Sequence, residues 1–342
     1  MMKTTINDIA KAANVAKSTV SKVLNDAPTI SEATKQKVRA IMKELQYTPS
    51  SIATQLARQS SMNIGFLMNF DRKDDFLNPF FYSLLGGAES VTFEYQYELT
   101  ISNINNRDND FMNQYVYSKK LDGMLINPSV LDKDIVQELE RLAFPFVIVG
   151  KPRENYGSGI AWVDIDNNAG GSMAAHHLLE QGYSRIAFLG SKPEDQISDS
   201  RLTGYLNVVS ALPGAARNDD YIRLGGGDES HGYRMMNELL DLKLRPDSII
   251  CVNNFVAFGA LKAARDRGVR VPEELGIVTF DNYPLAPYTT PAITALDIDT
   301  FNLGVLATKA LFGKIKQHEP GPQFQSIKPE LIVRESTLRQ GC

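Results

Sequence analysis

Residues 4–47 read TTINDIAKAANVAKSTVSKVLNDAPTISEATKQKVRAIMKELQY and contain three amphipathic patterns in close succession. Over residues 6–13, apolar side chains recur at i, i+3, i+4 and i+7, which places them on one face of a helix. The same spacing returns over residues 20–24 and over residues 38–45. Three short helices with one apolar face each predict a small shared core at this end of the chain.

Polar residues mark where these helices begin. Thr5 and Asp8 have the spacing of a capping box before the first helix, and Ser31 follows the breaker Pro28 as a cap for the third. The first two helices are separated by about three residues, Asn-Val-Ala, as in a helix-turn-helix.

The second helix has a polar face opposite its apolar one. If Val20, Val23 and Leu24 point into the core, four side chains that can hydrogen-bond to bases or phosphates point outward. These are Lys17, Ser18, Ser21 and Lys22. This arrangement is typical of a recognition helix in a major groove, and a generic three-helix bundle is the alternative.

The charge of the chain is divided unevenly along its length. Residues 1–60 contain nine Lys and Arg against four Asp and Glu, a net charge of +5, whereas the remaining 282 residues contain 27 against 36, a net charge of -9. A basic head on an acidic body favours a polyanion partner for the head, although a solvated basic helix would give the same count.

The head resembles a known family of transcription regulators. TINDIAKAANVAKSTVSKVLN followed by ISEATKQKVRAIMKELQYTPSSIATQLA is similar to the headpiece of the lactose-repressor (LacI/GalR) family, and the similarity extends over nearly the whole chain. The resemblance implies binding to double-stranded operator DNA, with Lys17, Ser18 and Lys22 reading bases. It implies DNA-backbone or structural roles for Thr5, Thr19, Ser21, Asn25 and Ser31.

Two residues of the second helix depart from the family. Ala16 stands where a helix-capping Ser is usual, and Lys22 stands where Arg is frequent. Lysine keeps the positive charge but lacks the two-pronged guanidinium that pairs with guanine, so Lys22 is expected to discriminate bases less sharply than Arg would.

Residues 48–60 are expected to form a linker. Pro49 ends the third helix, and IATQLARQ is too short to form a stable helix in water by itself. The resemblance implies a hinge helix that pairs across a dimer in the minor groove, with Ala53 and Leu56 contacting DNA and Leu56 wedged between base pairs. Packing of Leu56 within an ordinary linker is the alternative.

From Asn63 onward the pattern changes to short apolar runs alternating with helical periods. The runs are NIGFLMN, YELTISN, LDGMLIN, FPFVIVG, RIAFLGS, DSIICVNN and LGIVTFDN. Continuous apolar strands between amphipathic segments favour parallel sheets covered on both faces. The predicted fold is therefore an all-α helix-turn-helix headpiece plus an α/β body of two doubly wound parallel-sheet lobes, and the resemblance implies a periplasmic-binding-protein-like body.

The expected domains follow from these patterns. They are a headpiece over 1–47, a linker over 48–60 and an effector-binding and dimerisation body over 61–342, with a first lobe of about 61–162 and 291–322 and a second lobe of about 163–290 and 323–342.

Candidate ligand residues follow the predicted strands, because ligands of open parallel sheets bind outside the carboxyl ends of the strands. They mix amides, charges and an aromatic ring, which suits the hydroxyls and ring faces of a sugar. They are Phe70, Asp71, Asn127, Lys151, Asn253 and Asp281. Asn and Asp at strand ends also cap turns without any ligand.

The family resemblance adds to this set. Arg201, Asn253 and Asp281 match positions that commonly hold effector in the family. The usual Asn-Asp pair reads Asn253-Asn254 here, which changes the charge at that turn and makes Phe255 the nearer aromatic ring.

Two further segments resemble one branch of the family. FPFVIVGKP and AWVDIDN are similar to Gram-positive maltose or malto-oligosaccharide operon repressors, which would add Lys151 and Asp164 to the effector site. Alternatively, Lys151 projects into solvent and Asp164 supports the crossover between lobes.

Other classes of function find little support in the sequence. The four histidines, His176, His177, His231 and His318, are scattered, and neither a dinucleotide fingerprint nor a phosphate-binding loop occurs, so we expect no enzyme, cofactor or metal site. Without a signal segment or an apolar run of membrane length, a cytoplasmic protein is expected over an exported sugar-binding protein. Control by a protein co-regulator in place of a sugar stays open.

The expected mechanism is that of a homodimer on a pseudo-palindromic operator, since two-fold protein symmetry matches two-fold DNA symmetry. Sugar between the lobes would change their relative angle and the spacing of the paired hinges. The resemblance implies that sugar releases repression. No heptad pattern follows Leu338, so the sequence gives no sign of a tetramer.

Overall fold

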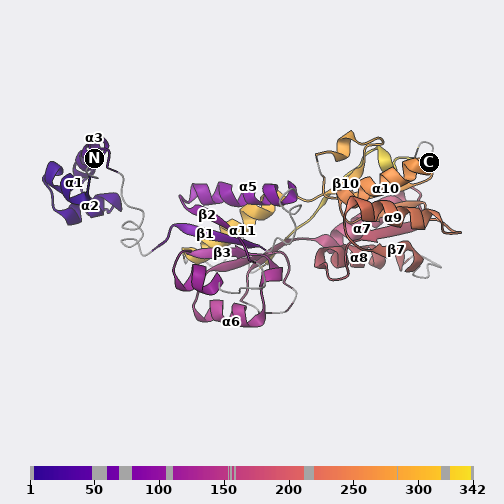
Figure 1. Cartoon of the computed structure of the whole chain (residues 1–342), viewed down its shortest axis with the longest axis horizontal. Helices are drawn as coiled ribbons and strands as arrows, with labels where there is room; N and C mark the ends of the chain where they lie inside the picture. Colours follow the sequence, from indigo (N-terminus) through magenta and orange to yellow (C-terminus); the bar gives the residue numbers. More distant parts are fainter. Residues whose placement is uncertain are drawn as a thin grey trace.

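The computed structural model describes residues 4–47, 60–68, 79–104, 111–152, 154, 156–157, 159–211, 219–282, 284–316 and 324–339. Figure 1 shows a small helical headpiece followed by two α/β lobes. The predicted fold class is confirmed.

The headpiece consists of α1 (Ile6–Ala13), α2 (Lys17–Leu24) and α3 (Glu32–Glu44). Each helix contributes its apolar face to one core, as the spacing predicts. The buried residues of this core are Ile9, Ala10, Ala13, Val20, Val23 and Val38.

The first lobe is built on a six-stranded sheet in the order β11-β5-β4-β3-β1-β2, in which every pair is parallel. Its strands are β1 (Asn63–Met68), β2 (Glu98–Asn103), β3 (Gly123–Ile126), β4 (Phe146–Val149), β5 (Trp162–Ile165) and β11 (Phe324–Ile327). Helices α5 (Pro79–Glu94) and α11 (Thr300–Ile315) share a core with one face of the sheet. The other face packs against α6 (Lys133–Arg141) and the π-helix η2 (Met112–Tyr117).

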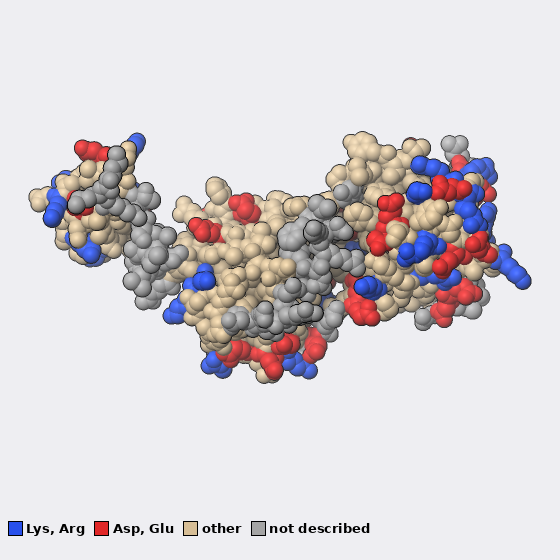
Figure 2. Space-filling model, viewed as in Figure 1, with Lys and Arg blue, Asp and Glu red and all other residues tan. Residues whose placement is uncertain are grey.

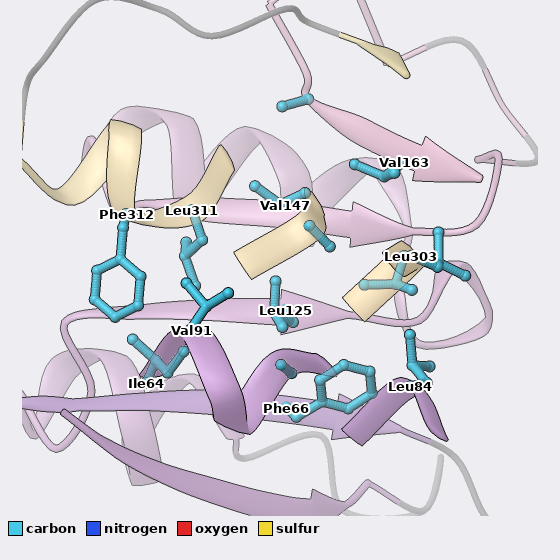
Figure 3. Close-up of a cluster of buried hydrophobic side chains, with 14 of the residues drawn as sticks. Ile64, Phe66, Leu84, Val91, Leu125, Val147, Val163, Leu303, Leu311 and Phe312 are labelled. Carbon is cyan, nitrogen blue, oxygen red and sulfur yellow. The ribbon is translucent and has the colours of Figure 1, made fainter. Parts of the chain in front are cut away.

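Figure 3 shows the core beneath α5 and α11, where Leu84 and Val91 of α5 and Leu303 of α11 point toward strand residues such as Phe66 and Leu125. These side chains are at most 3% exposed. The near-continuous apolar strands noted in the sequence follow from this burial on both faces.

The second lobe has the sheet order β12-β10-β9-β8-β6-β7, parallel except where β12 pairs with β10. Its strands are β6 (Ile186–Gly190), β7 (Ile222–Leu224), β8 (Ser248–Cys251), β9 (Gly276–Phe280), β10 (Thr294–Asp297) and β12 (Glu330–Ile332). Helices α7 (Asn167–Glu180) and α8 (Gln196–Val209) cover one face, and α9 (Glu229–Leu240) and α10 (Asn254–Asp266) cover the other. Short 3-10 turns lie at η3 (Pro128–Val130), η4 (Asp219–Tyr221), η5 (Ala286–Tyr288) and η6 (Glu335–Thr337).

Glycines set the closest approach of the paired helices. A Cβ on Gly304 of α11 would lie 2.1 Å from the carbonyl oxygen of Leu84 in α5, and one on Gly87 would lie 2.0 Å from that of Phe301. No side chain fits at such distances, so this crossing requires glycine on both helices. The α7–α8 and α9–α10 pairs meet in the same way, at Gly171 with Gly204 and at Gly232 with Gly259.

The lobe boundaries differ from those expected. Strand β10 belongs to the second sheet, although 291–322 is expected in the first lobe, and β11 belongs to the first sheet, although 323–342 is expected in the second. Likewise β5 completes the first sheet beyond residue 162. The reason is the pairing of each strand: β10 lies beside β9 and β11 beside β5, so the chain changes lobe only after a strand is complete.

Within the described ranges, no helix is both long enough and apolar enough to cross a lipid bilayer.

Candidate functional site

The outward face of α2 is the first candidate surface. Lys17, Ser18 and Lys22 are exposed, whereas Val20 and Val23 point into the headpiece core. Thr19, Ser21 and Asn25 are half-buried at its edges. The structure thus brings the three predicted base-reading side chains to one exposed helix.

The cations of this helix are available to an external anion. Among the described residues neither Lys17 nor Lys22 takes part in an ion pair. Lys35 of α3, in contrast, is buried and lies 3.0 Å from Asp26 and 3.1 Å from Glu32. Hydrogen bonding to Asp26 raises the pKa of Lys35.

Charges on the second lobe are arranged differently. Figure 2 shows Lys and Arg interleaved with Asp and Glu at the end of this lobe. Several are paired, as in Lys262 with Asp266 at 2.8 Å and Arg270 with Glu274 at 3.0 Å. Because paired surface charges cancel locally, this end does not form a single-sign surface for DNA.

The helix ends explain several of the other predicted DNA contacts. Thr5 donates its backbone N–H and its hydroxyl to Asp8, at 2.8 and 2.7 Å, and the Ser31 hydroxyl accepts the N–H of Thr34. Ala16 begins α2 without a side-chain cap, as its departure from the family pattern implies. The predicted contacts Ala53 and Leu56 lie outside the described residues.

A cavity of about 580 Å³ lies where the two lobes meet. Its size is within the range of sites for small organic ligands. The first lobe and the second lobe both contribute to its wall, together with the two segments at residues 297–300 and 327–330 that connect them. The lining residues are Pro79, Phe80, Ser83, Asn253, Asn254, Phe255, Asp281, Asn282, Pro284, Asp297, Ile298, Asp299, Thr300, Ile327, Lys328 and Glu330.

Asp281 and Arg201 form the charged centre of the second-lobe wall. Asp281 follows β9 with a φ of 68°, an uncommon conformation for a residue other than glycine, and it lines the cavity. Arg201 is 4% exposed and lies behind it, with Nη2 3.6 Å from Asp281 Oδ1. Burial raises the pKa of the Asp281 carboxyl, and the charge of Arg201 opposes this rise.

Arg201 is held from several sides. Its Nε donates to Asn167 Oδ1 at 2.9 Å, and its Nη1 donates to the carbonyl of Val252. The guanidinium carbon lies 4.0 Å from the centre of the Phe280 ring. Arg201 therefore positions Asp281 from behind the cavity, and it is not among the lining residues.

The turn between β8 and α10 supplies three more wall residues. Asn253 caps α10 by accepting the N–H of Val256 at 2.9 Å, and its amide donates to Gly227, so this side chain is engaged by the fold. Asn254 is 2% exposed and donates to the backbone carbonyls of Phe280 and Asp281. The ring of Phe255 is 40% exposed beside them.

The remaining predicted effector residues lie apart from this wall. The Asn127 side chain accepts two hydrogen bonds from Ser129 and caps a 3-10 turn. Asp164 accepts the backbone N–H of Lys151 at 3.0 Å, and burial raises the pKa of its carboxyl. Neither Asn127, Lys151 nor Asp164 lines the cavity. Phe70 and Asp71 lie outside the described residues.

Three acidic residues of the cavity were missed by sequence reasoning: Asp297, Asp299 and Glu330. Asp297 is the last residue of β10, which is parallel to β9, so it lies at the same sheet edge as Asp281. The run ITALD at residues 293–297 has the strand-end signal used for the other candidates. Among the described residues, no cluster of His, Cys, Asp and Glu is arranged to hold a metal ion.

Family models match both parts of the chain. Residues 5–50 match the model described as bacterial regulatory proteins, lacI family, and residues 175–337 match the periplasmic binding protein-like domain.

Curated relatives match over nearly the whole chain. An HTH-type transcriptional repressor PurR of Photobacterium profundum is 30% identical over 339 residues, covering 97% of this chain and 98% of the relative. That of Escherichia fergusonii is 31% identical, covering 97% and 96%. These names do not support the expected likeness to maltose operon repressors.

Solved structures of the same architecture cover nearly the whole chain. The complex of the transcriptional regulator CelR with cellobiose is 26% identical, covers 98% of this chain and 100% of that chain, and has a TM-score of 0.73. The lac repressor dimer bound to operator and the anti-inducer ONPF is 23% identical, covers 99% and 100%, and has a TM-score of 0.81, which shows the same fold.

Proposed function

The chain belongs to the lacI family of bacterial regulatory proteins and is a DNA-binding transcriptional repressor with a ligand-binding body, and we propose that it represses a carbohydrate-utilisation operon until a sugar enters the cavity. The observation that carries this proposal is the cavity itself. Its wall combines the carboxylate of Asp281 with the aromatic ring of Phe255.

A hydroxylated ligand suits this wall. Carboxylates accept hydrogen bonds from hydroxyl groups, and an aromatic ring covers the apolar face of a sugar ring. The similarity to the cellobiose complex of CelR supports the same class of ligand. Maltose and malto-oligosaccharides are the finer proposal, based on the segments FPFVIVGKP and AWVDIDN.

The headpiece supplies the DNA contacts of the proposed mechanism. Lys17, Ser18 and Lys22 of α2 would read base edges in the major groove, and a homodimer would place two such helices on a pseudo-palindromic operator. The lac repressor structure in the comparison is a dimer on its operator, which supports this arrangement.

The position of the cavity supports a coupling between ligand binding and DNA binding. Phe80 comes from the first lobe, Asp281 from the second, and Asp299 from a connecting segment, so a bound ligand would contact all three. A ligand that fits one lobe angle better than another shifts the population toward that angle. We propose that the sugar-bound angle lowers the affinity of the headpiece for operator.

Calorimetry on the full-length protein tests the effector class. Maltose, maltotriose, cellobiose and ribose are titrated beside a purine base, which is included because of the relatives named PurR. The proposal expects saturable heat with at least one sugar and a weaker or absent signal with the base. Heat with the base alone would overturn the sugar proposal, as would operator binding that requires a phosphocarrier protein and ignores every sugar.

A further inference from the structure

Two oxygens behind the cavity wall lack a hydrogen-bond donor. Oδ1 of Asn254 and Oδ1 of Asp281 are both inaccessible to solvent and lack hydrogen-bond partners in the described part of the chain, although Asp281 Oδ1 lies 3.6 Å from Arg201 Nη2. Asn254 is only 2% exposed, and its amide nitrogen is already engaged by Phe280 and Asp281. A ligand in the cavity does not reach these two atoms, but the carboxylates that line the cavity can accept hydrogen bonds, so the wall suits a ligand that donates.

Further negative charge lies beside Asp281, at the same edge of the second-lobe sheet. Asp297 ends β10, Asp299 caps α11, and Glu330 begins β12; all three line the cavity. Burial, together with the charges of Asp299 and Glu330, raises the pKa of the Asp297 carboxyl. These carboxylates repel one another, and no ion pair of theirs occurs within the described ranges.

Positive charge at the cavity does not balance these groups. Lys328 is the one basic residue among the described lining residues, against the four carboxylates of Asp281, Asp297, Asp299 and Glu330. Arg201 is committed to Asp281, and Arg334 donates to Asn282 and to the carbonyl of Ile293. An entering anion would meet acceptors and carboxylates, with Lys328 as the single lining cation of the described wall.

We propose that the effector is a hydrogen-bond donor without phosphate or carboxylate groups, and that Asp297 is the residue that rejects the anionic form of an otherwise acceptable sugar. This inference rests on the proposed function and narrows its ligand class. A free sugar offers hydroxyl donors to the carboxylates that line the cavity, whereas a phosphate group adds only further acceptors and negative charge.

The chemistry also places the effector in a reaction sequence. A sugar phosphorylated on entry would be excluded, so the effector must arise from uptake or hydrolysis that leaves its hydroxyl groups free. A kinase that phosphorylates the sugar would then remove the effector.

The test compares free and phosphorylated forms of two sugars on the full-length protein. Maltose and cellobiose are titrated by calorimetry beside their 6'-phosphate esters, and we expect each ester to bind at least about tenfold more weakly than the free sugar that does bind, as expected for like charges brought close together. The Asp297→Asn variant should narrow this ratio. If Asp297→Asn fails to fold, the same ratio is measured for Glu330→Gln, at an exposed position of β12.

Asp134→Asn on the exposed surface of α6 is the matched control, since it removes the same charge outside the cavity and should leave the ratio unchanged. An ester that binds as tightly as its free sugar would overturn this inference but not the proposed function. So would a ratio that neither Asp297→Asn nor Glu330→Gln alters. If no sugar binds in either form, the proposed function fails and this inference fails with it.

Discussion

Arg201 Nη2 lies 3.6 Å from Asp281 Oδ1, a contact that joins helix α8 to the residue following β9. The two partners differ in burial, because the Arg201 side chain is 5% exposed and that of Asp281 is 26% exposed. Removing the deeply buried partner leaves a carboxylate without its counter-charge, and it also leaves the acceptors of Asn167 and Val252 without their donor.

We therefore predict that Arg201→Ala destabilises the protein by about 3–5 kcal/mol, the cost of breaking a buried pair, and that Asp281→Asn costs less. Urea unfolding of the two variants and of the unaltered protein measures both values. Equal losses for the two variants would contradict the prediction.

At the uncapped start of α2 we predict a substitution that increases stability. Ala16 has an extended backbone, with φ of -67° and ψ of 149°, and supplies no side-chain hydrogen bond. Ala16→Ser should stabilise α2 by about 1 kcal/mol, because a serine hydroxyl can accept an unpaired N–H of the first turn. Hydrogen exchange of the α2 amides measures the gain. Ala12→Ser, at an exposed position inside α1, should bring none.

Lys22 is predicted to contribute a base contact. Lys22→Ala should raise the dissociation constant for operator about 5- to 100-fold, the range for one specific contact, and should lower the dependence of binding on salt. Lys22→Arg should sharpen discrimination between operator variants at one guanine. Fluorescence anisotropy with labelled operator checks this against Lys192→Ala, an exposed lysine of the second lobe, which should bind as the unaltered protein does.

Stability of the second lobe should fall as the pH falls below neutrality. His177 is 5% exposed, its Nε2 lies 2.8 Å from the Thr337 hydroxyl, and burial lowers its pKa from 6.5. The unfolded chain therefore takes up a proton near pH 6.5 while the folded protein does not, so stability is lost as pH falls from there toward the folded pKa.

Each such histidine contributes a slope of at most about 1.4 kcal/mol per pH unit. His177→Gln should flatten the dependence of the melting temperature on pH between about 7.5 and 5.5, the window in which an ordinary histidine titrates. His176→Gln changes the exposed neighbour in α7 and should leave the slope as it was. A slope that His177→Gln does not reduce contradicts the prediction.

The headpiece could be predicted from the sequence because its information is local. The apolar spacing that places Val20 and Val23 in the core also places Lys17, Ser18 and Lys22 outside, and all contacts of that core lie within one short segment. The missing cap at Ala16 could be read in the same way.

The lobe boundaries could not be predicted so well, because strand pairing is a long-range property. Strand β11 pairs with β5, whose residues lie about half the chain away, and nothing in the local pattern of residues 324–327 indicates that partner. The sequence identifies such a segment as a strand but does not say which sheet it completes.

Site residues were predicted only where the strand-end rule and the fold coincide. Asp281, Asn253 and Phe255 line the cavity, although the Asn253 side chain also caps α10. Asn127 caps a 3-10 turn away from the cavity, an alternative that the sequence left open. The sequence showed Asn254 only as a departure from the usual Asn-Asp pair of the family. That its buried oxygen lacks a hydrogen-bond partner follows from three-dimensional packing, which the sequence does not show.

The central claim is that a sugar in the cavity lowers the affinity of the headpiece for operator. The most direct measurement is the operator dissociation constant at saturating concentrations of the sugar found by calorimetry, for the unaltered protein and for Asp281→Asn. We predict a rise of about 5- to 150-fold for the unaltered protein, the usual range of allosteric coupling, and little change for the variant. An operator affinity that stays the same or increases with the bound sugar would contradict the claim.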